Sequence, residues 1–399
     1  MNRNIQQLST IAAKPGRNII GLMSGTSLDG LDIAFCNISG AGLQTQVNLL
    51  HFETIPYEDD FKNEVRTIFS KENIRLQQLC LLNGWIATQH ASMINECLQK
   101  WGIQKEEIDL IASHGQTIYH APVSLHGMPK YGNGTLQIGD GDHLAVQTGI
   151  ITISDFRQKH IAAGGEGAPL AVYGDYILFK EKEKDVILLN IGGIANFTFL
   201  PAGNDLSEMF STDVGPGNTM MDAWIRKRYP EKYFDQDAAI ALRGRVNEVL
   251  LEALLQHPFF TLPFPRTTGP ELFNLSYLET ALAATELNHI APEDVLATLN
   301  RFSAVSIVDA LKKITAKNNT ILYVSGGGAH NPMLMHYIGE HINSLIIEST
   351  SKKNIDPDAK EAILFALLAN EAVSGNVQDY PKNTKGFPSI TMGKISFPT

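Results

Sequence analysis

The sequence has little cysteine. Its three cysteines are Cys36, Cys80 and Cys97. Because they are odd in number, far apart and without a Cys-x-x-Cys pair, we expect neither a disulfide framework nor a structural zinc site. We interpret them as small apolar residues buried in a protein that stays in a reducing compartment.

Long apolar runs and an excess of positive charge are also missing. No stretch approaches the roughly 20 apolar residues that a membrane-spanning helix needs. The segment from Met1 to Arg17 holds no continuous apolar run of signal-peptide length. A net charge of −10 argues against a nucleic acid held through its phosphates. We therefore expect a cytoplasmic protein without a membrane or nucleic-acid partner, which meets anionic substrates with local donors.

The segment 18–35 reads as a strand, a tight polar turn and a second strand, because apolar runs flank two glycines and several hydroxyl residues. We expect Gly25 and Gly30 to take positive φ and to expose backbone N–H groups that, with the hydroxyls, suit phosphate oxygens. The turn lacks Gly-Lys-Ser/Thr and the dinucleotide fingerprint, so it is neither a Walker A loop nor a Rossmann turn. An ordinary hairpin turn with polar decoration is the alternative.

Two later glycine-rich turns follow strands. Residues 186–200 repeat the order of strand, turn and strand, with Gly192 and Gly193 in the turn. Residues 320–332 place three consecutive glycines between a strand and a helix with Asn331 as its N-cap and Pro332 at its first position. Consecutive glycines at a helix entrance allow a flat ligand to lie against the backbone.

The first two hairpins, 18–35 and 186–200, each open a half of similar length. A chain of 399 residues is long enough for two cores, and 44% hydrophobic with 19% charged residues is an ordinary globular composition. This internal repetition predicts two like-folded lobes rather than two unrelated domains.

Several polar residues stand at strand ends, where active-site loops are commonly built. His114 is either a ligand-binding group or a structural histidine of its turn. Arg157, in the glycine-rich loop 155–170, can pair with a carboxylate or phosphate, although that loop also reads as a flexible connection. Asp213 precedes a Gly-Pro-Gly turn, and Asn218 is a credible helix N-cap. On composition alone Asp213 is a capping or dipole partner of that helix.

The string from Met23 to Asp32, Met-Ser-Gly-Thr-Ser-Leu-Asp-Gly-Leu-Asp, resembles the N-terminal signature of the anhydro-N-acetylmuramic acid kinases, an actin/Hsp70/sugar-kinase-like family. Further matching strings run nearly to the C-terminus. The resemblance implies an α/β fold of two actin-like (RNase H-like) lobes with mixed sheets flanked by helices, and a nucleotide in the interlobe cleft. It implies lobe I at 17–154 plus 362–399 and lobe II at 155–361.

The resemblance also implies an activity. An ATP-dependent kinase of this family, assisted by Mg²⁺, would open the 1,6-anhydro bridge of 1,6-anhydro-N-acetylmuramic acid with water and phosphorylate O6. The products would be N-acetylmuramate 6-phosphate and ADP, as in peptidoglycan recycling. Asp213 matches the family's catalytic base, and Glu361 matches an acidic residue near the sugar. For Glu361 a solvated residue in a helix's first turn is the alternative, and for the oligomeric state a homodimer is one alternative.

The expected site residues fall into two sets. Those expected to bind the nucleotide are Gly25, Thr26, Ser27, Leu28, Asp29, Gly30, Leu31, Asp32, Gly192, Gly193, Gly326, Gly327 and Gly328. Those expected to bind the sugar are His114, Gln116, Arg157, Gly165 and Asn218. No residue is assigned as a metal ligand.

One position departs from the family pattern. The family string Asp-Phe-Arg-x-x-Asp ends here in His160, which argues against an acidic role at that position. Two other activities stay open. One is a kinase for a simpler anhydrosugar such as levoglucosan, which turnover on the two sugars would distinguish. The other is a nucleotide-driven binding protein of the Hsp70 or actin kind, whose mark would be ATP turnover independent of any sugar.

Overall fold

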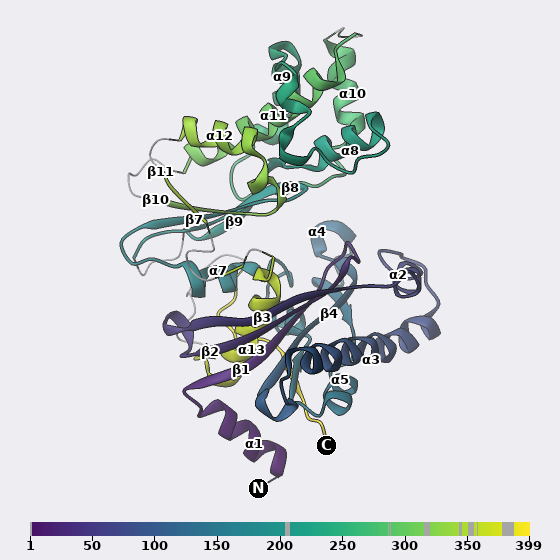
Figure 1. The fold of residues 1–399 in the computed structure, drawn as a ribbon, viewed down its shortest axis with the longest axis vertical. Coiled ribbons are helices and arrows are strands. Elements are labelled where there is room, and N and C mark those ends of the chain that lie inside the picture. Colours follow the sequence, from purple (N-terminus) through teal and green to yellow (C-terminus); the bar gives the residue numbers. More distant parts are fainter. Residues whose placement is uncertain are drawn as a thin grey trace. The chain divides into compact units, whose positions relative to one another are not determined.

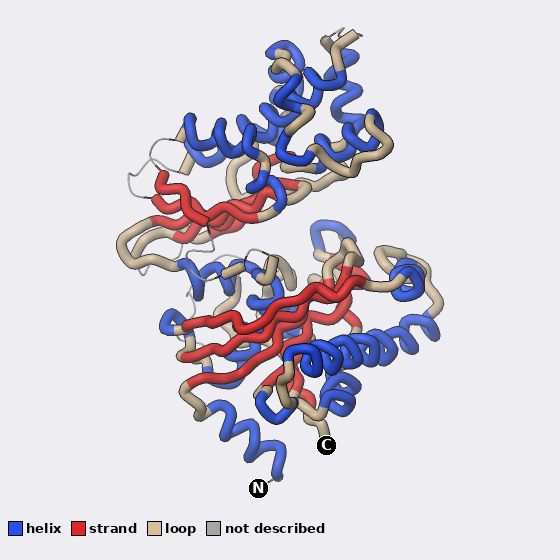
Figure 2. The backbone as a smooth tube through the Cα atoms, viewed as in Figure 1, coloured by secondary structure: helices blue, strands red, loops and turns tan. Residues whose placement is uncertain are grey.

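The computed structural model contains two compact units, one formed by Met1–Lys180 with Lys353–Thr399 and the other by Glu181–Lys352. Each unit is built on one β-sheet with helices around it (Figures 1 and 2). The structure describes residues 2–203, 208–285, 287, 289–314, 320–342, 345–349, 355–356, 358–376 and 387–399. Within these ranges, no helix combines the length and the apolar character that crossing a membrane requires.

The sheet of the first unit has the strand order β12-β6-β4-β1-β2-β3, and β5 pairs with β4. The strands β1, β2 and β3 form an antiparallel meander, and β4 and β6 continue the sheet parallel to β1. The bounds are β1 (Gly16–Ser24), β2 (Gly30–Ser39), β3 (Gln46–Pro56), β4 (Leu110–Ala121), β5 (Gly134–Ile138), β6 (Thr152–Ser154) and β12 (Lys394–Ser396).

Two long helices cover opposite faces of this sheet. Ile20 and Leu22 of β1 pack in the core that contains apolar residues of α3 (Leu76–Trp101). Gly21, between them, faces α13 (Lys360–Ser374), because a Cβ at Gly21 would lie 2.0 Å from the carbonyl oxygen of Ala362. Side chains alternate along a strand, so the two helices lie on different sides. The other helices are α1 (Arg3–Ala12), α2 (Asp59–Arg66), α4 (Val123–His126), α5 (Gly141–Thr148), α6 (Phe156–Ala162) and α7 (Ala171–Phe179).

The division of the chain differs from the expected lobe boundaries. Residues 155–180 belong to the first unit and not to the second. Their last helix, α7, packs closely on α13, and a Cβ at Gly174 would lie 2.7 Å from Cδ1 of Leu364. The glycine-rich loop therefore continues the first unit, and the crossing to the second unit falls after Lys180.

The second unit repeats the topology of the first. Its strand order is β11-β10-β7-β8-β9, with β7, β8 and β9 antiparallel and β10 and β11 parallel to β7. The meander followed by two parallel strands is the order in which β1, β2, β3, β4 and β6 are arranged, so the prediction of two like-folded α/β lobes is confirmed. The bounds are β7 (Asp185–Ile191), β8 (Ile194–Leu200), β9 (Phe210–Pro216), β10 (Thr320–Ser325) and β11 (Leu345–Ser349).

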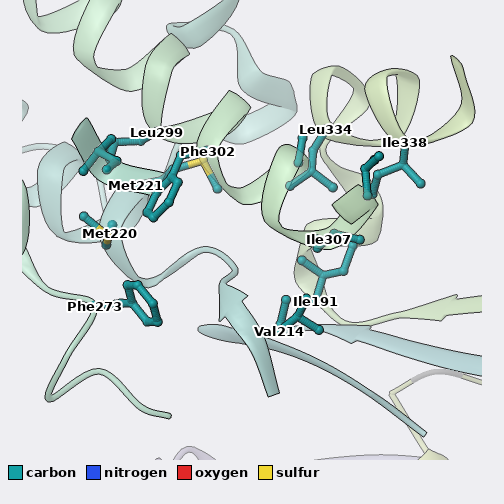
Figure 3. Packing of buried hydrophobic residues seen from close by; sticks show 14 of the residues in the cluster. Ile191, Val214, Met220, Met221, Phe273, Leu299, Phe302, Ile307, Leu334 and Ile338 are labelled. Atoms are coloured by element: carbon teal, nitrogen blue, oxygen red, sulfur yellow. The ribbon is translucent and has the colours of Figure 1, made fainter. Parts of the chain in front are cut away.

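Helices pack on this second sheet around one apolar core (Figure 3). Ile191 and Val214 of the sheet contribute to it together with Phe302, Leu334 and other helical residues. The long helix α11 is buried along most of its length, which explains its many apolar and small residues. The helices are α8 (Thr219–Arg228), α9 (Glu248–Leu255), α10 (Leu275–Ala284), α11 (Pro292–Lys312) and α12 (Pro332–His341).

Candidate active site

The turn between β1 and β2 is built differently from the sequence expectation. Neither Gly25 nor Gly30 has positive φ, whereas Leu28 does, at 60°. Gly30 is required by close packing, because a Cβ there would lie 2.4 Å from the carbonyl oxygen of Ile55 in β3. The expected reason for this glycine is therefore wrong. Gly25 borders open space, since the nearest atom to its Cβ would be the Ser27 hydroxyl at 3.5 Å.

The residues expected in the phosphate turn separate into exposed and buried sets. Thr26, Ser27 and Asp29 are exposed, so their polar groups are available to a ligand. Leu28 and Leu31 are buried in the core and anchor the turn. Only backbone groups of these two leucines remain as ligand donors.

A buried hydrogen-bond chain supports the base of this turn. Ser24 donates to Oε1 of Gln116, and its Oγ lies 2.6 Å from the Tyr57 hydroxyl. Because Ser24 has one hydroxyl proton, it accepts from Tyr57, which then accepts from Nε2 of His90 at 2.9 Å. Gln116 is fully buried and also donates to the Gly25 carbonyl at 3.3 Å. The structure thus places Gln116, which we expected to bind sugar, beneath the phosphate turn.

His114 and Arg157, two of the expected sugar-binding residues, contact each other. Nε of Arg157 donates to Nε2 of His114 at 3.0 Å, and its Nη1 donates to the Gly167 carbonyl at 2.7 Å. Burial, with help from the Arg157 charge, lowers the pKa of His114 to about 3. The imidazole is therefore neutral and carries its proton on Nδ1, which has no partner among the described residues. His114 is both a structural histidine against Phe365 and a polar group of the site.

Gly165 packs against the side chain of His160. A Cβ at Gly165 would lie 2.1 Å from Cε1 of His160, so this glycine makes room for that ring. Nδ1 of His160 accepts from the Gly167 N–H at 2.9 Å. Burial lowers the pKa of His160 to about 4, and the neutral ring can act as this acceptor. His160, which departs from the family pattern, fixes the glycine-rich loop.

Acidic groups of the first unit lie near Arg157. Glu361 stands in the first turn of α13, and the atoms packed around its carboxylate raise its pKa. The charge of Asp32 raises that pKa further, while Arg157 lowers it. Partial burial likewise raises the pKa of Asp32, although a 2.6 Å hydrogen bond from Thr54 opposes the shift. The charges of two other expected site residues thus act on Glu361. Residue Glu361 is also exposed, as expected for a solvated residue in a helix's first turn.

Asp213 lies on β9 where the pairing with β8 shifts register between Ala195 and Asn196. Such an irregularity redirects side chains and is frequent beside active sites. Oδ2 of Asp213 accepts from the backbone N–H of Thr268 at 2.9 Å. Burial raises the pKa of Asp213, and the Thr268 N–H opposes that rise. The carboxylate is therefore a partly desolvated base and is held by Thr268 rather than by α8.

Arg266 fixes the segment that carries Thr268. Its guanidinium is buried and donates to the carbonyl oxygens of Phe259 at 2.7 Å and Val214 at 3.1 Å. Its backbone carbonyl accepts from the Asp213 N–H at 2.9 Å. The segment 266–274 resembles a family loop on the nucleotide side of the cleft, but the sequence did not predict that Arg266 and Thr268 contact β9, because those contacts span more than 50 positions of the chain.

The glycine turns of the second unit have distinct roles. Gly326 has φ of 83°, a conformation that favours glycine. A Cβ at Gly328 would lie 2.2 Å from Cγ2 of Ile191, so close packing requires that glycine. Gly327 is open, with Nδ2 of Asn218 3.6 Å from its Cβ position. Asn218 stands before α8 as expected, yet its side chain donates to the Ile191 carbonyl at 3.3 Å instead of capping the helix.

The turn at Gly192 and Gly193 packs on the start of α8. The carbonyl oxygen of Gly192 accepts from the Asn218 N–H at 2.8 Å, and that of Gly193 accepts from the Gly217 N–H at 2.9 Å. A Cβ at Gly217 would lie 2.2 Å from the Gly192 carbonyl oxygen. The hairpin turn thereby holds Asn218 beside Gly327.

A cavity of about 690 Å³ within the second unit is bordered by Gly327 and Asn218. Tyr233 and Phe234 also line it, and their side chains are 80% and 58% exposed. Burial raises the pKa of Asp222, on the same wall, to about 6. Sequence reasoning missed these three residues, although two adjacent aromatics in a polar stretch are a signal for a ligand surface.

Comparisons with known proteins cover almost the whole chain. The sequence model of the family described as anhydro-N-acetylmuramic acid kinase matches residues 17–398. Proteins of that name from Pseudoalteromonas atlantica and Pseudoalteromonas translucida are 55% and 50% identical, each over 100% of both chains. One from Caldanaerobacter subterraneus is 36% identical over 98% of this chain and 100% of its own. The chain therefore belongs to the anhydro-N-acetylmuramic acid kinase family.

Proposed function

We propose that the protein is an ATP-dependent kinase that opens the 1,6-anhydro bridge of 1,6-anhydro-N-acetylmuramic acid with water and phosphorylates O6. The products are N-acetylmuramate 6-phosphate and ADP. The observation that carries the chemistry is the carboxylate of Asp213, oriented through a 2.9 Å hydrogen bond from Thr268 to one oxygen. Full-length similarity to proteins named for this substrate supports the choice of sugar.

Asp213 would act as the general base. Water adds to C1 of the sugar on the face opposite the bridging oxygen, and Asp213 takes its proton. The C1–O6 bond breaks, and O6 takes the γ-phosphoryl group, so the departing oxygen needs no separate acid. Burial makes the carboxylate more basic than an exposed aspartate, which favours proton transfer near neutral pH.

The cavity beside Gly327 would hold the nucleoside. Its volume of about 690 Å³ is within the usual range of ligand pockets, and the open backbone at Gly327 lets a flat ring approach. Exposed Tyr233 and Phe234 offer apolar surface for the adenine ring. The start of α8 after Asn218 would face anionic groups with its N-terminal dipole.

The first unit would supply phosphate and sugar contacts. Exposed Thr26 and Ser27 offer hydroxyl donors at the turn after β1. Mg²⁺ commonly binds one or two carboxylates together with phosphate oxygens, and Asp29 and Asp32 supply such carboxylates. Burial raises the pKa of Asp32, and the charges of Asp358 and Asp29 raise it further, so a cation there would relieve repulsion. When bound, the ion would neutralise phosphate charge.

The sugar would meet Arg157, His114 and Glu361. Arg157 is a donor for an anionic substituent, and the neutral His114 ring holds its guanidinium in place. Glu361 has a raised pKa, which suits a group that exchanges hydrogen bonds with sugar hydroxyls.

Mass spectrometry of products formed from ATP and 1,6-anhydro-N-acetylmuramic acid in ¹⁸O water tests this function. The proposal expects one label at the C1 hydroxyl and none in the phosphoryl group, because water attacks carbon. Label in the phosphoryl oxygens would contradict the mechanism. Faster turnover of levoglucosan would indicate a simpler anhydrosugar as substrate, and ATP turnover without any sugar would indicate a binding protein.

A further inference from the structure

Thr268 carries a polar group that the fold leaves without a partner. Its Oγ1 is buried and receives or donates no hydrogen bond among the described residues. Its backbone N–H donates to Oδ2 of Asp213 at 2.9 Å. Oγ1 is three bonds from the nitrogen of that N–H, so the unpaired hydroxyl belongs to the residue that binds the Asp213 carboxylate. Buried hydroxyl groups are almost always paired, so this one indicates a ligand or a water.

The second oxygen of Asp213 is the other half of the arrangement. Within the described part of the chain, the hydrogen bond from Thr268 to Oδ2 is the one made to this carboxylate. Oδ1 therefore remains an acceptor, and the hydroxyl of Thr268 can also accept. A water molecule has two hydrogens to donate, and these two oxygens can receive both.

The position of Thr268 is fixed by its neighbour. The backbone N–H of Arg266 donates to Oγ1 of Thr212, and its carbonyl oxygen accepts from the Asp213 N–H. The Arg266 guanidinium donates to the Val214 carbonyl at 3.1 Å. Cation–π contacts hold it 4.3 Å from the Phe259 ring centroid. The segment that presents Thr268 is thereby tied to the strand that presents Asp213.

We propose that Thr268 is a further catalytic residue, whose hydroxyl holds the attacking water together with Asp213. The inference rests on the proposed function. One water hydrogen is donated to Asp213 Oδ1 and the other to Thr268 Oγ1, which directs an oxygen lone pair at C1. As the water oxygen bonds to C1, the C1–O6 electron pair passes to O6, which bonds to the γ-phosphorus while ADP leaves. The water proton ends on Asp213.

Steady-state kinetics of Thr268→Val, Thr268→Ser and Thr267→Val test this role. Valine keeps the shape and removes the hydroxyl, serine keeps the hydroxyl, and Thr267 is an exposed neighbour that serves as the control. Losing one oriented hydrogen bond in the transition state should lower kcat about 10- to 100-fold in Thr268→Val. The KM values for sugar and ATP should stay unchanged, Thr268→Ser should restore most of kcat, and Thr267→Val should match the wild type.

Three outcomes decide the matter. Near-normal kcat in Thr268→Val, with the wild type active on the anhydrosugar, overturns the role of Thr268 alone. A wild type that does not convert the sugar overturns the proposed function and this inference with it. If valine prevents folding, as thermal melting would show, Thr268→Ala replaces it, and an active alanine variant overturns the proposal.

Discussion

The hydroxyl oxygens of Tyr57 and Ser24 lie 2.6 Å apart in the interior of the first unit. Tyr57 also contacts Nε2 of His90 at 2.9 Å, so it connects α3 to the last residue of β1. The turn expected to grip phosphate begins directly after that residue. Its base is thus held by buried hydrogen bonds from α3 and β4.

Tyr57→Phe should destabilise the first unit and weaken ATP binding. The change leaves Nε2 of His90 without an acceptor and Ser24 without a donor, at a cost of about 1–3 kcal/mol in the free energy of unfolding. Urea denaturation and calorimetric titration with ATP measure the two effects. Tyr131→Phe, at an exposed tyrosine, should change neither. Equal stability of Tyr57→Phe and the wild type would show that the buried hydrogen bonds of Tyr57 do not stabilise the first unit.

Two glycines of the phosphate turn should respond differently to substitution. A Cβ at Gly30 would lie 2.4 Å from the Ile55 carbonyl, so Gly30→Ala should separate β2 from β3 and cost about 1–3 kcal/mol of unfolding free energy. Gly25 has open space, so Gly25→Val should fold normally and block the approach of phosphate. Thermal melting and ATP calorimetry distinguish the two results. Unchanged ATP affinity in folded Gly25→Val would refute the phosphate role.

A second glycine pair tests the nucleoside site. Gly327→Ala should leave stability unchanged and weaken ATP binding, because its Cβ would enter the cavity without a clash. Gly328→Ala should instead lower the free energy of unfolding by about 1–3 kcal/mol, since its Cβ would meet buried Ile191 at 2.2 Å. Calorimetry and denaturation measure the two effects in both variants, and unchanged ATP affinity in Gly327→Ala would contradict nucleotide binding in the cavity.

Asp213→Asn should lower kcat by about 10² to 10⁴, the usual effect of losing a general base. Affinities for sugar and ATP should change little. Because the base must be deprotonated and burial raises the pKa of Asp213, wild-type kcat should fall with decreasing pH, with a midpoint above the ordinary value of about 3.9. The asparagine variant should lack this acid limb. A variant with near-normal turnover would leave Asp213 a structural residue.

Stability should decrease in mild acid. Burial lowers the pKa of His90 to about 4 from an ordinary 6.5, so the unfolded chain binds the proton more tightly. The stabilising effect of neutral His90 is complete above pH 6.5 and is lost as the pH falls toward 4, a change of about 3 kcal/mol. His114 and His160 act in the same direction. Denaturation across this range should give a smaller pH slope for His90→Gln, and an identical slope would disprove the assignment.

The sequence by itself determined the local elements and the two-fold plan. Alternating and continuous apolar runs predicted the hairpins at 18–35 and 186–200, which form β1 with β2 and β7 with β8. Asn331 and Pro332 predicted the start of α12, and the Asn331 side chain caps it by accepting from the Leu334 N–H at 3.0 Å. These features depend on neighbours within a few residues, so the sequence is enough to predict them.

Only the tertiary structure decided what surrounds the site residues. Gly30 is needed because Ile55 of a neighbouring strand approaches it, and Gln116 is buried because β4 runs beside β1. Thr268 reaches Asp213 across 55 positions of the chain. Such contacts depend on the order of the strands in the sheet and on which backbone segments pack closely against each other. A one-dimensional pattern of residue types does not contain that information, so the hydrogen-bond partners of the base and of the phosphate turn emerged only from the folded chain.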